Sequence, residues 1–458
     1  MSDTNVDLVV LGGGSGGYAA ALRAAELGSS VVLIEKEKVG GTCLHWGCVP
    51  AKTLLHAAEV ADEAKDGPSI GVTTTFTGVD VPALLKYKDG IINRLYKGLT
   101  GLVKSRGVQT VVGEGKFIGP NTVVVGGDRF IGKDVVLATG SYSRTLPGLE
   151  IEGRVINSTQ GLSLEWVPQT AIVLGGGVIG VEFASTWASF GTKVTIVEAL
   201  PTLVPLEDPW AAKLLERAFR KRKIDFKTGV RFQGVKQDDS GVTVSLEDGT
   251  TLTADLLLVA VGRGPYTAGC GYEEAGITME RGWVTTDERL HTNLPHVYAV
   301  GDIVPGLQLA HRGFQQGIFV AEEIAGLNPR VIPDAEIPKI TYCDPNVASV
   351  GLTEAKAKEV HGDSSIETYV YDLGGNGKSQ ILKTAGGVKL VRVKDGPIVG
   401  MHLVGARVGE LLGEAQLIVG WEAHPEDVAP YLHGHPSQYE AVGEAILALA
   451  GKPLHVHD

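Results

Sequence analysis

Residues 6–35 read VDLVVLGGGSGGYAAALRAAELGSSVVLIE, and this stretch decides the fold of the first part of the chain. An apolar run meets a glycine-rich turn, an alanine-rich helical segment follows, and a second apolar run ends at Glu35. Gly12, Gly14 and Gly17 satisfy G-x-G-x-x-G, a pattern that allows a tight turn, room for a pyrophosphate and close packing of helix on strand. Glu35 stands where a carboxylate takes ribose hydroxyls in such units. The stretch therefore predicts a dinucleotide site.

The same pattern recurs in residues 171–198, AIVLGGGVIGVEFASTWASFGTKVTIVE. The second triplet is Gly175, Gly177 and Gly180, and Glu198 closes the next strand-like run. Both the first glycine and the acid are displaced by 163 residues (175 − 12 and 198 − 35). Two unrelated glycine turns would have to produce this offset twice by chance. The repeat therefore predicts two dinucleotide-binding units and two dinucleotides.

The residues after the second acid indicate which nucleotide binds there. Glu198 is followed by Ala199 and Leu200, so no basic side chain stands ready for a 2′-phosphate. A carboxylate repels that phosphate but accepts a hydrogen bond from a free ribose hydroxyl. This pattern favours NAD over NADP.

Length and composition exclude several classes of protein. The chain has 458 residues, enough for about three domains. Its net charge is −12, which argues against a nucleic-acid partner. No stretch approaches the ~18 apolar residues of a membrane span. The start, MSDTNVDLVVLGGG, lacks the features of a secretion signal, so we expect a cytoplasmic protein without a membrane partner.

Two of the four cysteines lie close together in Gly40–Lys52, GGTCLHWGCVPAK. The following residues read as a helix with Pro50 in its first turn, and a helix N-terminus favours the thiolate form of Cys43 and Cys48. Half of a zinc site and an inert pair of buried thiols are the alternatives. No second Cys/His cluster has suitable spacing for zinc, so the residues favour a redox disulfide beside a flavin.

Both glycine units, the cysteine segment and VYAVGD at residues 297–302 together resemble the flavoprotein disulfide reductases, the pyridine nucleotide-disulfide oxidoreductase family. The resemblance runs nearly end to end. It implies that the first unit binds FAD, that the second binds NAD, and that Cys43 and Cys48 form the redox disulfide. It further implies flavin contact by Asp302, with Thr139–Gly140 and Gly262–Arg263 in strand-end turns near the two nucleotides.

The family also implies the architecture. We expect an α/β protein with two Rossmann-like dinucleotide-binding domains and a C-terminal α+β dimerisation domain. The expected boundaries are 1–146 for the FAD domain, 147–269 for the NAD domain, 270–334 for a central segment that completes the FAD site, and 335–458 for the dimer interface.

A second candidate site is HGHPSQYE at residues 433–440. A helix start with a chance histidine in front explains this spacing equally well, because Ser437 and Glu440 fit a capping box. In the family, however, the second histidine of this pattern is a base and the glutamate orients it, which points to His435 and Glu440. The base serves the disulfide of the other subunit, so the resemblance implies a homodimer.

The resemblance is strongest to the members that oxidise protein-bound dihydrolipoamide and pass hydride to NAD+. It implies a lipoyl-bearing acyltransferase of a 2-oxo acid dehydrogenase complex as partner, and a pair of Lys52 with Glu182 near the flavin. An NADPH-dependent member acting on glutathione or mycothione disulfide, and a non-catalytic docking subunit, are the alternatives. Four residues depart from the usual pattern and leave the shape of the substrate channel open: His45, Trp46, Ser437 and Tyr439.

Overall fold

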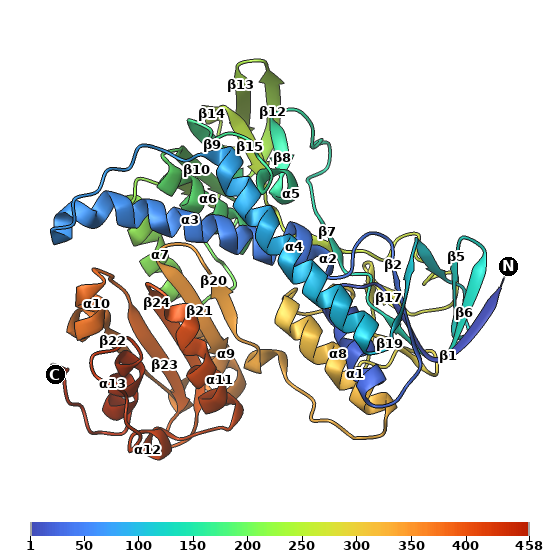
Figure 1. Ribbon diagram of the computed structural model, residues 1–458. Coiled ribbons are helices and arrows are strands. Elements are labelled where there is room, and N and C mark those ends of the chain that lie inside the picture. The colour runs from blue at the N-terminus through green and yellow to red at the C-terminus, as the bar shows by residue number, and fades with distance from the viewer. Residues whose placement is uncertain (1, 457–458) are drawn as a thin grey trace.

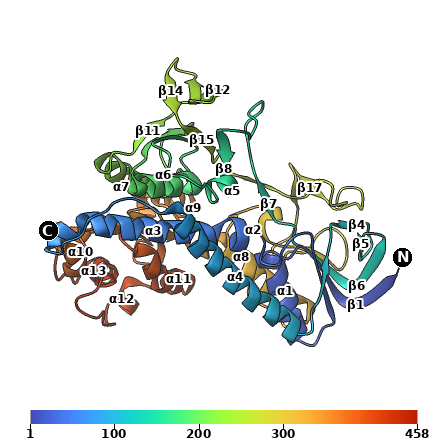
Figure 2. The same ribbon diagram turned by 45° about the horizontal axis from the view of Figure 1, so that its top comes forward.

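The computed structural model describes residues 2–456 (Figure 1). Residue 1, at the start of the predicted segment 1–146, and residues 457–458, at the end of 335–458, lie outside the described residues. Three lobes, each built on its own sheet, surround two long helices, α3 (Cys48–Asp66) and α4 (Val81–Ser105). These helices lie beside each other in both views (Figures 1 and 2). The α/β architecture agrees with the expected fold class.

The N-terminal lobe has a sheet in the order β3-β2-β1-β6-β5-β4, and a distant strand, β19, joins it at β6. Its parallel part consists of β1 (Asp3–Leu11), β2 (Val31–Glu35), β3 (Gln109–Val112), β6 (Asp128–Leu137) and β19 (Val297–Ala299). β4 (Gly115–Phe117) and β5 (Thr122–Val125) are antiparallel. Helices α1 (Ser15–Glu26) and α8 (Ala310–Ile324) pack side by side in this lobe (Figure 1).

The second lobe repeats the parallel arrangement in the order β11-β10-β9-β15-β8. Its strands are β8 (Val155–Asn157), β9 (Thr170–Leu174), β10 (Lys193–Glu198), β11 (Asp225–Thr228) and β15 (Leu256–Val259). Its helices are α5 (Ser158–Gly161), α6 (Val178–Phe190) and α7 (Pro209–Lys221), and an antiparallel sheet of β12 (Phe232–Asp238), β13 (Gly241–Leu246) and β14 (Thr251–Ala254) extends it. A two-stranded antiparallel sheet joins β7 (Ser141–Ser143), which comes before the second lobe in the chain, to β16 (Arg263–Pro265), which comes after it.

The C-terminal lobe is an antiparallel sheet in the order β20-β21-β24-β23-β22, with helices packed against it. The strands are β20 (Lys339–Thr341), β21 (Asn346–Gly351), β22 (Ile366–Asp372), β23 (Gly387–Val393) and β24 (Ile398–Gly405). The helices are α9 (Glu354–His361), α10 (Gly377–Ile381), α11 (Leu412–Gly420), α12 (Pro425–Val428) and α13 (Glu440–Leu449). A short hairpin of β17 (Met279–Glu280) and β18 (Trp283–Val284) belongs to the central segment.

The apolar runs of the sequence become the buried strands of the two parallel sheets. In β2 and β9 the burial is almost continuous rather than alternating, as expected for strands with helices on both faces. The glycine turns then sit at the carboxyl ends of β1 and β9, on the edge where parallel sheets bind nucleotides. Of the helices in the described range, none is long and apolar enough to cross a membrane.

Candidate active site

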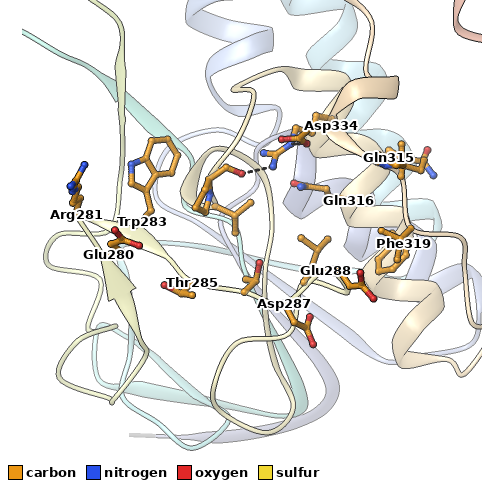
Figure 3. A pocket seen from close by; sticks show the side chains of 18 residues that line it. Glu280, Arg281, Trp283, Thr285, Asp287, Glu288, Gln315, Gln316, Phe319 and Asp334 are labelled. Carbon is orange, nitrogen blue, oxygen red and sulfur yellow. Dashed lines mark hydrogen bonds and ion pairs between the residues drawn. The ribbon is translucent and has the colours of Figure 1, made fainter. Parts of the chain in front are cut away.

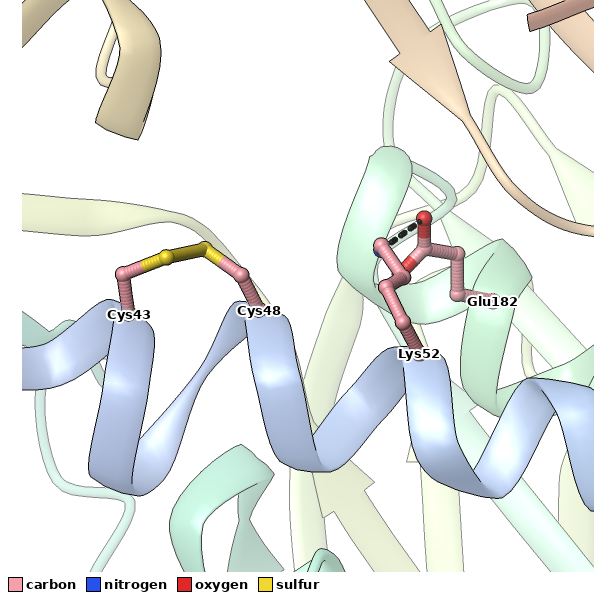
Figure 4. The surroundings of a disulfide bond; sticks show 4 residues. All are labelled: Cys43, Cys48, Lys52 and Glu182. Atoms are coloured by element: carbon pink, nitrogen blue, oxygen red, sulfur yellow. Dashed lines mark hydrogen bonds and ion pairs between the residues drawn. A yellow bond between two sulfur atoms is a disulfide. The ribbon is translucent and has the colours of Figure 1, made fainter. Parts of the chain in front are cut away.

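The cysteine pair is a disulfide in the structure (Figure 4). Cys43 lies in the short helix α2 (Gly41–Trp46) and Cys48 is the first residue of α3, with their Cα atoms 4.6 Å apart. The predicted helix after Cys48 is confirmed. Cys270 and Cys343 are free and buried, and burial raises the pKa of both thiols. Reactive sulfur chemistry is therefore confined to the Cys43–Cys48 pair.

A cavity of about 430 Å³ connects this disulfide with both glycine turns. Its walls include both cysteines, Gly14 from the first turn and Val178 from the start of α6 after the second turn. The side-chain nitrogen of Gln308, which also borders the cavity, is buried and has no hydrogen-bond partner in the described chain. An unpaired donor of this kind is the expected mark of a ligand-binding wall.

The first glycine turn is built as its sequence predicts. Gly12 has φ +107°, and a Cβ there would lie 2.2 Å from the carbonyl oxygen of Ala138. The carboxylate of Glu35 accepts hydrogen bonds from the backbone N–H groups of Gly13 (2.7 Å) and Glu37 (2.9 Å). Gly14 is the N-cap of α1 and supplies no side-chain cap, so the first turn of that helix presents its N–H groups to an anion.

The second turn has the same construction. Glu198 accepts hydrogen bonds from the backbone N–H groups of Gly176 (2.6 Å) and Leu200 (2.7 Å). Gly177 is the N-cap of α6 and supplies no side-chain cap. Gly180 packs so closely that a Cβ would lie 1.9 Å from the carbonyl oxygen of Gly175. The same contact in the first unit is that of Gly17, whose Cβ would lie 1.8 Å from the oxygen of Gly12.

Asp302 borders the cavity and belongs to a small polar network. It accepts a hydrogen bond from the Ser141 hydroxyl (2.5 Å), and the same hydroxyl accepts one from Arg263 Nε (2.8 Å). All three residues line the cavity, as does Gly140. Ser141 was not among the sequence predictions, although it directly follows the predicted Thr139–Gly140 turn.

Two of the residues predicted to lie near the nucleotides, Thr139 and Gly262, do not line this cavity. The hydroxyl of Thr139 donates to the carbonyl oxygen of Tyr266 (2.6 Å) and lies 2.9 Å from the Tyr272 hydroxyl. Its side chain is therefore committed within the protein. Gly262 has φ +101° and turns the chain into Arg263, which is the residue of that pair that reaches the cavity.

Lys52 and Glu182 form the predicted ion pair (Figure 4). Lys52 Nζ lies 2.6 Å from each carboxylate oxygen of Glu182, and this contact joins α3 to α6. The backbone N–H of Tyr342 donates to the same carboxylate (2.9 Å), and Lys52 Nζ lies 4.5 Å from the centre of the Tyr342 ring. Tyr342 comes from the C-terminal lobe, and no spacing in the sequence indicates that it reaches this pair.

His435 and Glu440 also meet. His435 Nδ1 lies 2.8 Å from Glu440 Oε1, and the Ser437 N–H donates to the other carboxylate oxygen (2.5 Å). Although partial burial opposes it, these contacts hold the pKa of Glu440 below its usual value, so the carboxylate is ionised. One hydrogen bond of the capping box is present, the one from the Ser437 N–H to Glu440, but α13 begins only at Glu440, with Tyr439 as its N-cap and no side-chain cap.

The His435 ring is 79% exposed, and the described residues that line the cavity include neither His435 nor Glu440. Within one chain, the His435–Glu440 pair and the disulfide are therefore separate. His45 and Trp46 lie beside the disulfide instead. His45 Nε2 contacts the Val39 carbonyl oxygen (3.0 Å) and its ring meets that of Tyr96, while Trp46 lines the cavity.

A larger cavity, about 790 Å³, lies between the β17–β18 hairpin and α8 (Figure 3). Its buried Arg312 is satisfied by Asp334 and by the carbonyl oxygens of Pro305 and Leu307. None of the predicted site residues lines it. Size alone therefore does not locate the chemistry. Across residues 2–456, no group of three or more His, Cys, Asp or Glu side chains is placed to hold a metal ion.

Two nucleotide turns that open on one disulfide define a nucleotide-dependent disulfide oxidoreductase. Residues 6–317 match the family described as pyridine nucleotide-disulphide oxidoreductase, and residues 337–446 match the dimerisation domain of the same family. The chain belongs to the pyridine nucleotide-disulphide oxidoreductase family. Its C-terminal lobe is the family's dimerisation domain, in agreement with the expected homodimer.

Curated relatives match almost the whole chain. A dihydrolipoyl dehydrogenase of Bacillus subtilis is 38% identical and covers 99% of both chains. Dihydrolipoyl dehydrogenase 2 of Arabidopsis thaliana mitochondria is also 38% identical, over 99% of this chain and 92% of its own length. Among solved structures, LpdA of Mycobacterium tuberculosis superposes with a TM-score of 0.90 at 26% identity, covering 98% of this chain and all of its own.

The family uses FAD and NAD(H), and the residues of this chain fit both. Each glycine turn leaves open space at its second glycine, since a Cβ on Gly14 or Gly177 would meet nothing within 4 Å. Each turn also places a fixed carboxylate, Glu35 or Glu198, at the end of the next strand. Gln308, whose side-chain nitrogen is unpaired in the described chain, borders the cavity that Gly14 also lines. The cofactor predictions of FAD and NAD are confirmed at the level of the family.

Proposed function

We propose that this protein oxidises protein-bound dihydrolipoamide to lipoamide and passes the electrons to NAD+. The observation that carries the proposal is the Cys43–Cys48 disulfide on the wall of the cavity that both glycine turns share. This arrangement gives two electrons from a dithiol a short route to a nucleotide. The full-length similarity to dihydrolipoyl dehydrogenases of Bacillus subtilis and Arabidopsis thaliana supports this substrate.

In the proposed reaction His435 accepts a proton from one thiol of the dihydrolipoyl group, and the ionised Glu440 stabilises the imidazolium. The resulting thiolate attacks the Cys43 sulfur, which breaks the Cys43–Cys48 bond and leaves Cys48 as a thiolate. The second lipoyl thiol then attacks the mixed disulfide. Cyclic lipoamide leaves, and both electrons of the dithiol remain on the two cysteines.

FAD, when bound, supplies the step that converts this pair of electrons into a hydride for NAD+. The chain contributes the surroundings. Lys52, paired with Glu182, places a fixed ion pair at the cavity wall, where it acts on a bound ring system as a preorganised charge. Asp302 and Arg263, joined through Ser141, hold charges on another part of the same wall.

His435 is exposed and does not line the cavity beside the disulfide of its own chain. In the proposed homodimer it therefore serves the disulfide of the partner subunit. The physiological partner in this proposal is the lipoyl-bearing acyltransferase of a 2-oxo acid dehydrogenase complex. The cytoplasmic location inferred from the sequence stays a prediction.

The domain assignment forms part of the same proposal. Residues 1–146 and 270–334 together bind FAD, residues 147–269 bind NAD, and residues 335–458 form the interface. The pairing of β19 with β6 supports the first assignment, because it brings the central segment back into the N-terminal sheet.

The test is a substrate matrix with the purified holoenzyme. NADH and NADPH are each offered with lipoamide, glutathione disulfide and mycothione disulfide, and the reverse reaction is followed with dihydrolipoamide and NAD+. We expect NADH with lipoamide to give the highest kcat/KM by at least about tenfold. A preference for NADPH with a low-mass disulfide would establish the alternative instead.

A further inference from the structure

The loop between α12 and α13 carries two imidazoles, and each is hydrogen-bonded to a carboxylate on a different helix. His435 pairs with Glu440 on α13, as described above. His433 Nε2 lies 2.8 Å from Oε1 of Glu414 on α11. The His433 side chain is 11% exposed, whereas that of His435 is 79% exposed. The first ring is thus anchored inside the lobe, while the second is presented outside it.

The His433 ring occupies a space that α13 leaves open. A Cβ on Gly443 would lie 2.5 Å from His433 Nδ1, so only the absence of a side chain there admits the ring. The Tyr439 ring lies 5.3 Å from it, centre to centre. The Tyr439 hydroxyl also accepts a hydrogen bond from the Gly434 N–H (2.7 Å). His433 is therefore wedged between α11 and the start of α13.

After His435 the loop is held by Asn376 Nδ2, which donates to the Ser437 carbonyl oxygen (2.9 Å), and by Gln438 Nε2, which donates to the Ala406 carbonyl oxygen (2.8 Å). Before His435, the side chains next to His433 do not perform this anchoring. Tyr431 and Leu432 are 74% and 96% exposed in the chain, so burial does not hold them. Gly434 has no side chain, and the Ser437 hydroxyl bonds back to the Gly434 carbonyl within the same loop. Of residues 431–434, His433 is the one whose side chain forms a hydrogen bond to another helix.

We propose that His433, bonded to Glu414, is a positioning residue that fixes this loop and so holds His435 in the orientation needed to take the substrate proton. The inference rests on the proposed function for the reaction that His435 serves. Positioning matters in such a reaction because a displacement of ~1 Å can lower a rate by about 10²-fold.

The bond to Glu414 favours the charged form of the His433 ring. The hydrogen bond to Glu414 raises the pKa of His433, against the opposing effect of burial, and the Glu440 charge adds to it. Tyr439 on α13 is a further titratable group that packs against the ring. A raised pKa stabilises the folded loop fully below about pH 6.5, and this contribution is lost as the pH rises through the folded value.

The experiment uses the full-length holoenzyme and two substitutions at the anchor. His433→Phe keeps a ring in the wedge but removes the bond to Glu414. His433→Gln places an uncharged N–H donor where Nε2 stood. The matched control is His455→Phe, because His455 forms a similar 2.8 Å contact with Glu444 on α13 but lies outside the loop. Hydrogen exchange of residues 429–440 and kcat/KM for dihydrolipoamide are measured against pH.

We expect His433→Phe to increase exchange across residues 429–440 and to lower kcat/KM between about tenfold and 10²-fold. NADH-dependent dye reduction, which needs no dithiol base, is retained. His433→Gln retains most of the wild-type kcat/KM near neutral pH. Its hydrogen exchange does not increase as the pH rises, because the amide does not titrate. Glu414→Gln reproduces the increased exchange, and the double variant with His433→Phe is no worse than either single one.

Unchanged exchange in His433→Phe, or an equal loss of activity in His455→Phe, would overturn the positioning role. A wild-type protein that does not oxidise dihydrolipoamide would overturn the proposed function alone. The exchange measurement would still decide what His433 does for the loop, because it requires no turnover.

Discussion

The two glycine units make the same hydrogen bonds at their turns, but different elements pack around them. In each, a carboxylate at the end of the second strand accepts two backbone hydrogen bonds at the same offsets: Glu35 from Gly13 and Glu37, and Glu198 from Gly176 and Leu200. Such agreement across 163 residues shows that the local sequence is sufficient to build the nucleotide turn.

The difference lies in what packs against the helix after each turn. Glu182 on α6 corresponds to Ala19 on α1 (182 − 163). Near Ala19, helix α8 approaches so closely that a Cβ on Gly317 would lie 2.2 Å from the Gly16 carbonyl oxygen. At Glu182, helix α3 brings Lys52 to 2.6 Å. In the first unit, α1 packs closely against α8 through glycines. In the second unit, an ion pair joins α6 to α3, the helix that carries Cys48.

In the proposed function the repeated turn therefore supplies nucleotide binding, and the packing that is not repeated supplies the chemistry. Nothing equivalent to the cysteine segment follows the second unit: after Glu198 the chain continues through Ala199 and Leu200 to α7. Four changes separate the two contributions, given from the largest expected effect to the smallest.

Removal of one sulfur would abolish the non-repeated chemistry while leaving both turns intact. We expect Cys48→Ser to lower kcat for dihydrolipoamide oxidation by at least the order of 10³-fold, because no disulfide remains to accept electrons. NADH-dependent dye reduction reports the nucleotide turns and should persist. Cys343→Ser is the control, since that thiol is buried and forms no disulfide. Full turnover in Cys48→Ser would refute the catalytic reading of the pair.

A methyl group at the second glycine of each turn would separate the two nucleotides. Gly14 and Gly177 have ordinary extended φ angles of −72° and −75° and open space at Cβ, so alanine should fold normally at both. We expect Gly14→Ala to lower retention of the yellow flavin. Gly177→Ala should stay yellow but raise KM for NAD+ by about 10²-fold, as a methyl crowds a packed pyrophosphate. Equal effects of both changes on both nucleotides would contradict the assignment.

Glu198 offers a smaller and more selective change. Loss of its ribose hydrogen bond in Glu198→Ala should raise KM for NADH about tenfold, the value of one charged hydrogen bond. The KM for NADPH should fall or stay the same, because the repelling carboxylate is gone. Steady-state kinetics with both nucleotides measures the ratio. Glu35→Ala serves as the matched control and should leave that ratio unchanged.

The second unit, unlike the first, is tied to the C-terminal sheet by buried charges. Lys389 Nζ lies 2.9 Å from Asp208 at the start of α7, and the adjacent His402 contacts the Leu352 carbonyl oxygen (3.0 Å). Burial lowers the pKa of His402, although the Asp208 charge opposes it. His402 therefore contributes its full stabilisation of the folded protein above about pH 6.5. This contribution is lost as the pH falls from there towards the lower pKa that His402 has in the folded protein.

This acid sensitivity is the smallest of the four effects. We expect His402→Gln, which keeps a donor for Leu352, to lose less stability on acidification, by at most about 1.4 kcal/mol per pH unit. Urea denaturation between pH 7 and the onset of acid unfolding measures it. An identical pH slope in wild type and variant would show that His402 is not responsible.

The sequence by itself determined the parts of the protein that depend on near neighbours in the chain. The glycine turns, the acids that end β2 and β10, and the helix after Cys48 follow from local rules of turns, strands and helix starts. His435 and Glu440 meet because they are only five residues apart. The roles assigned to them came from the family resemblance, since the spacing alone fitted a capping box equally well.

Only the tertiary structure decided which distant side chains meet. Tyr342 reaches Glu182 across 160 residues of sequence, and Ser141 reaches Asp302 across 161. The Thr139 hydroxyl turns away from the cavity that its neighbour Gly140 borders. His433 finds Glu414 through a gap left by Gly443. Such contacts depend on how three lobes pack, and local sequence patterns carry little information about packing between elements that lie far apart in the chain.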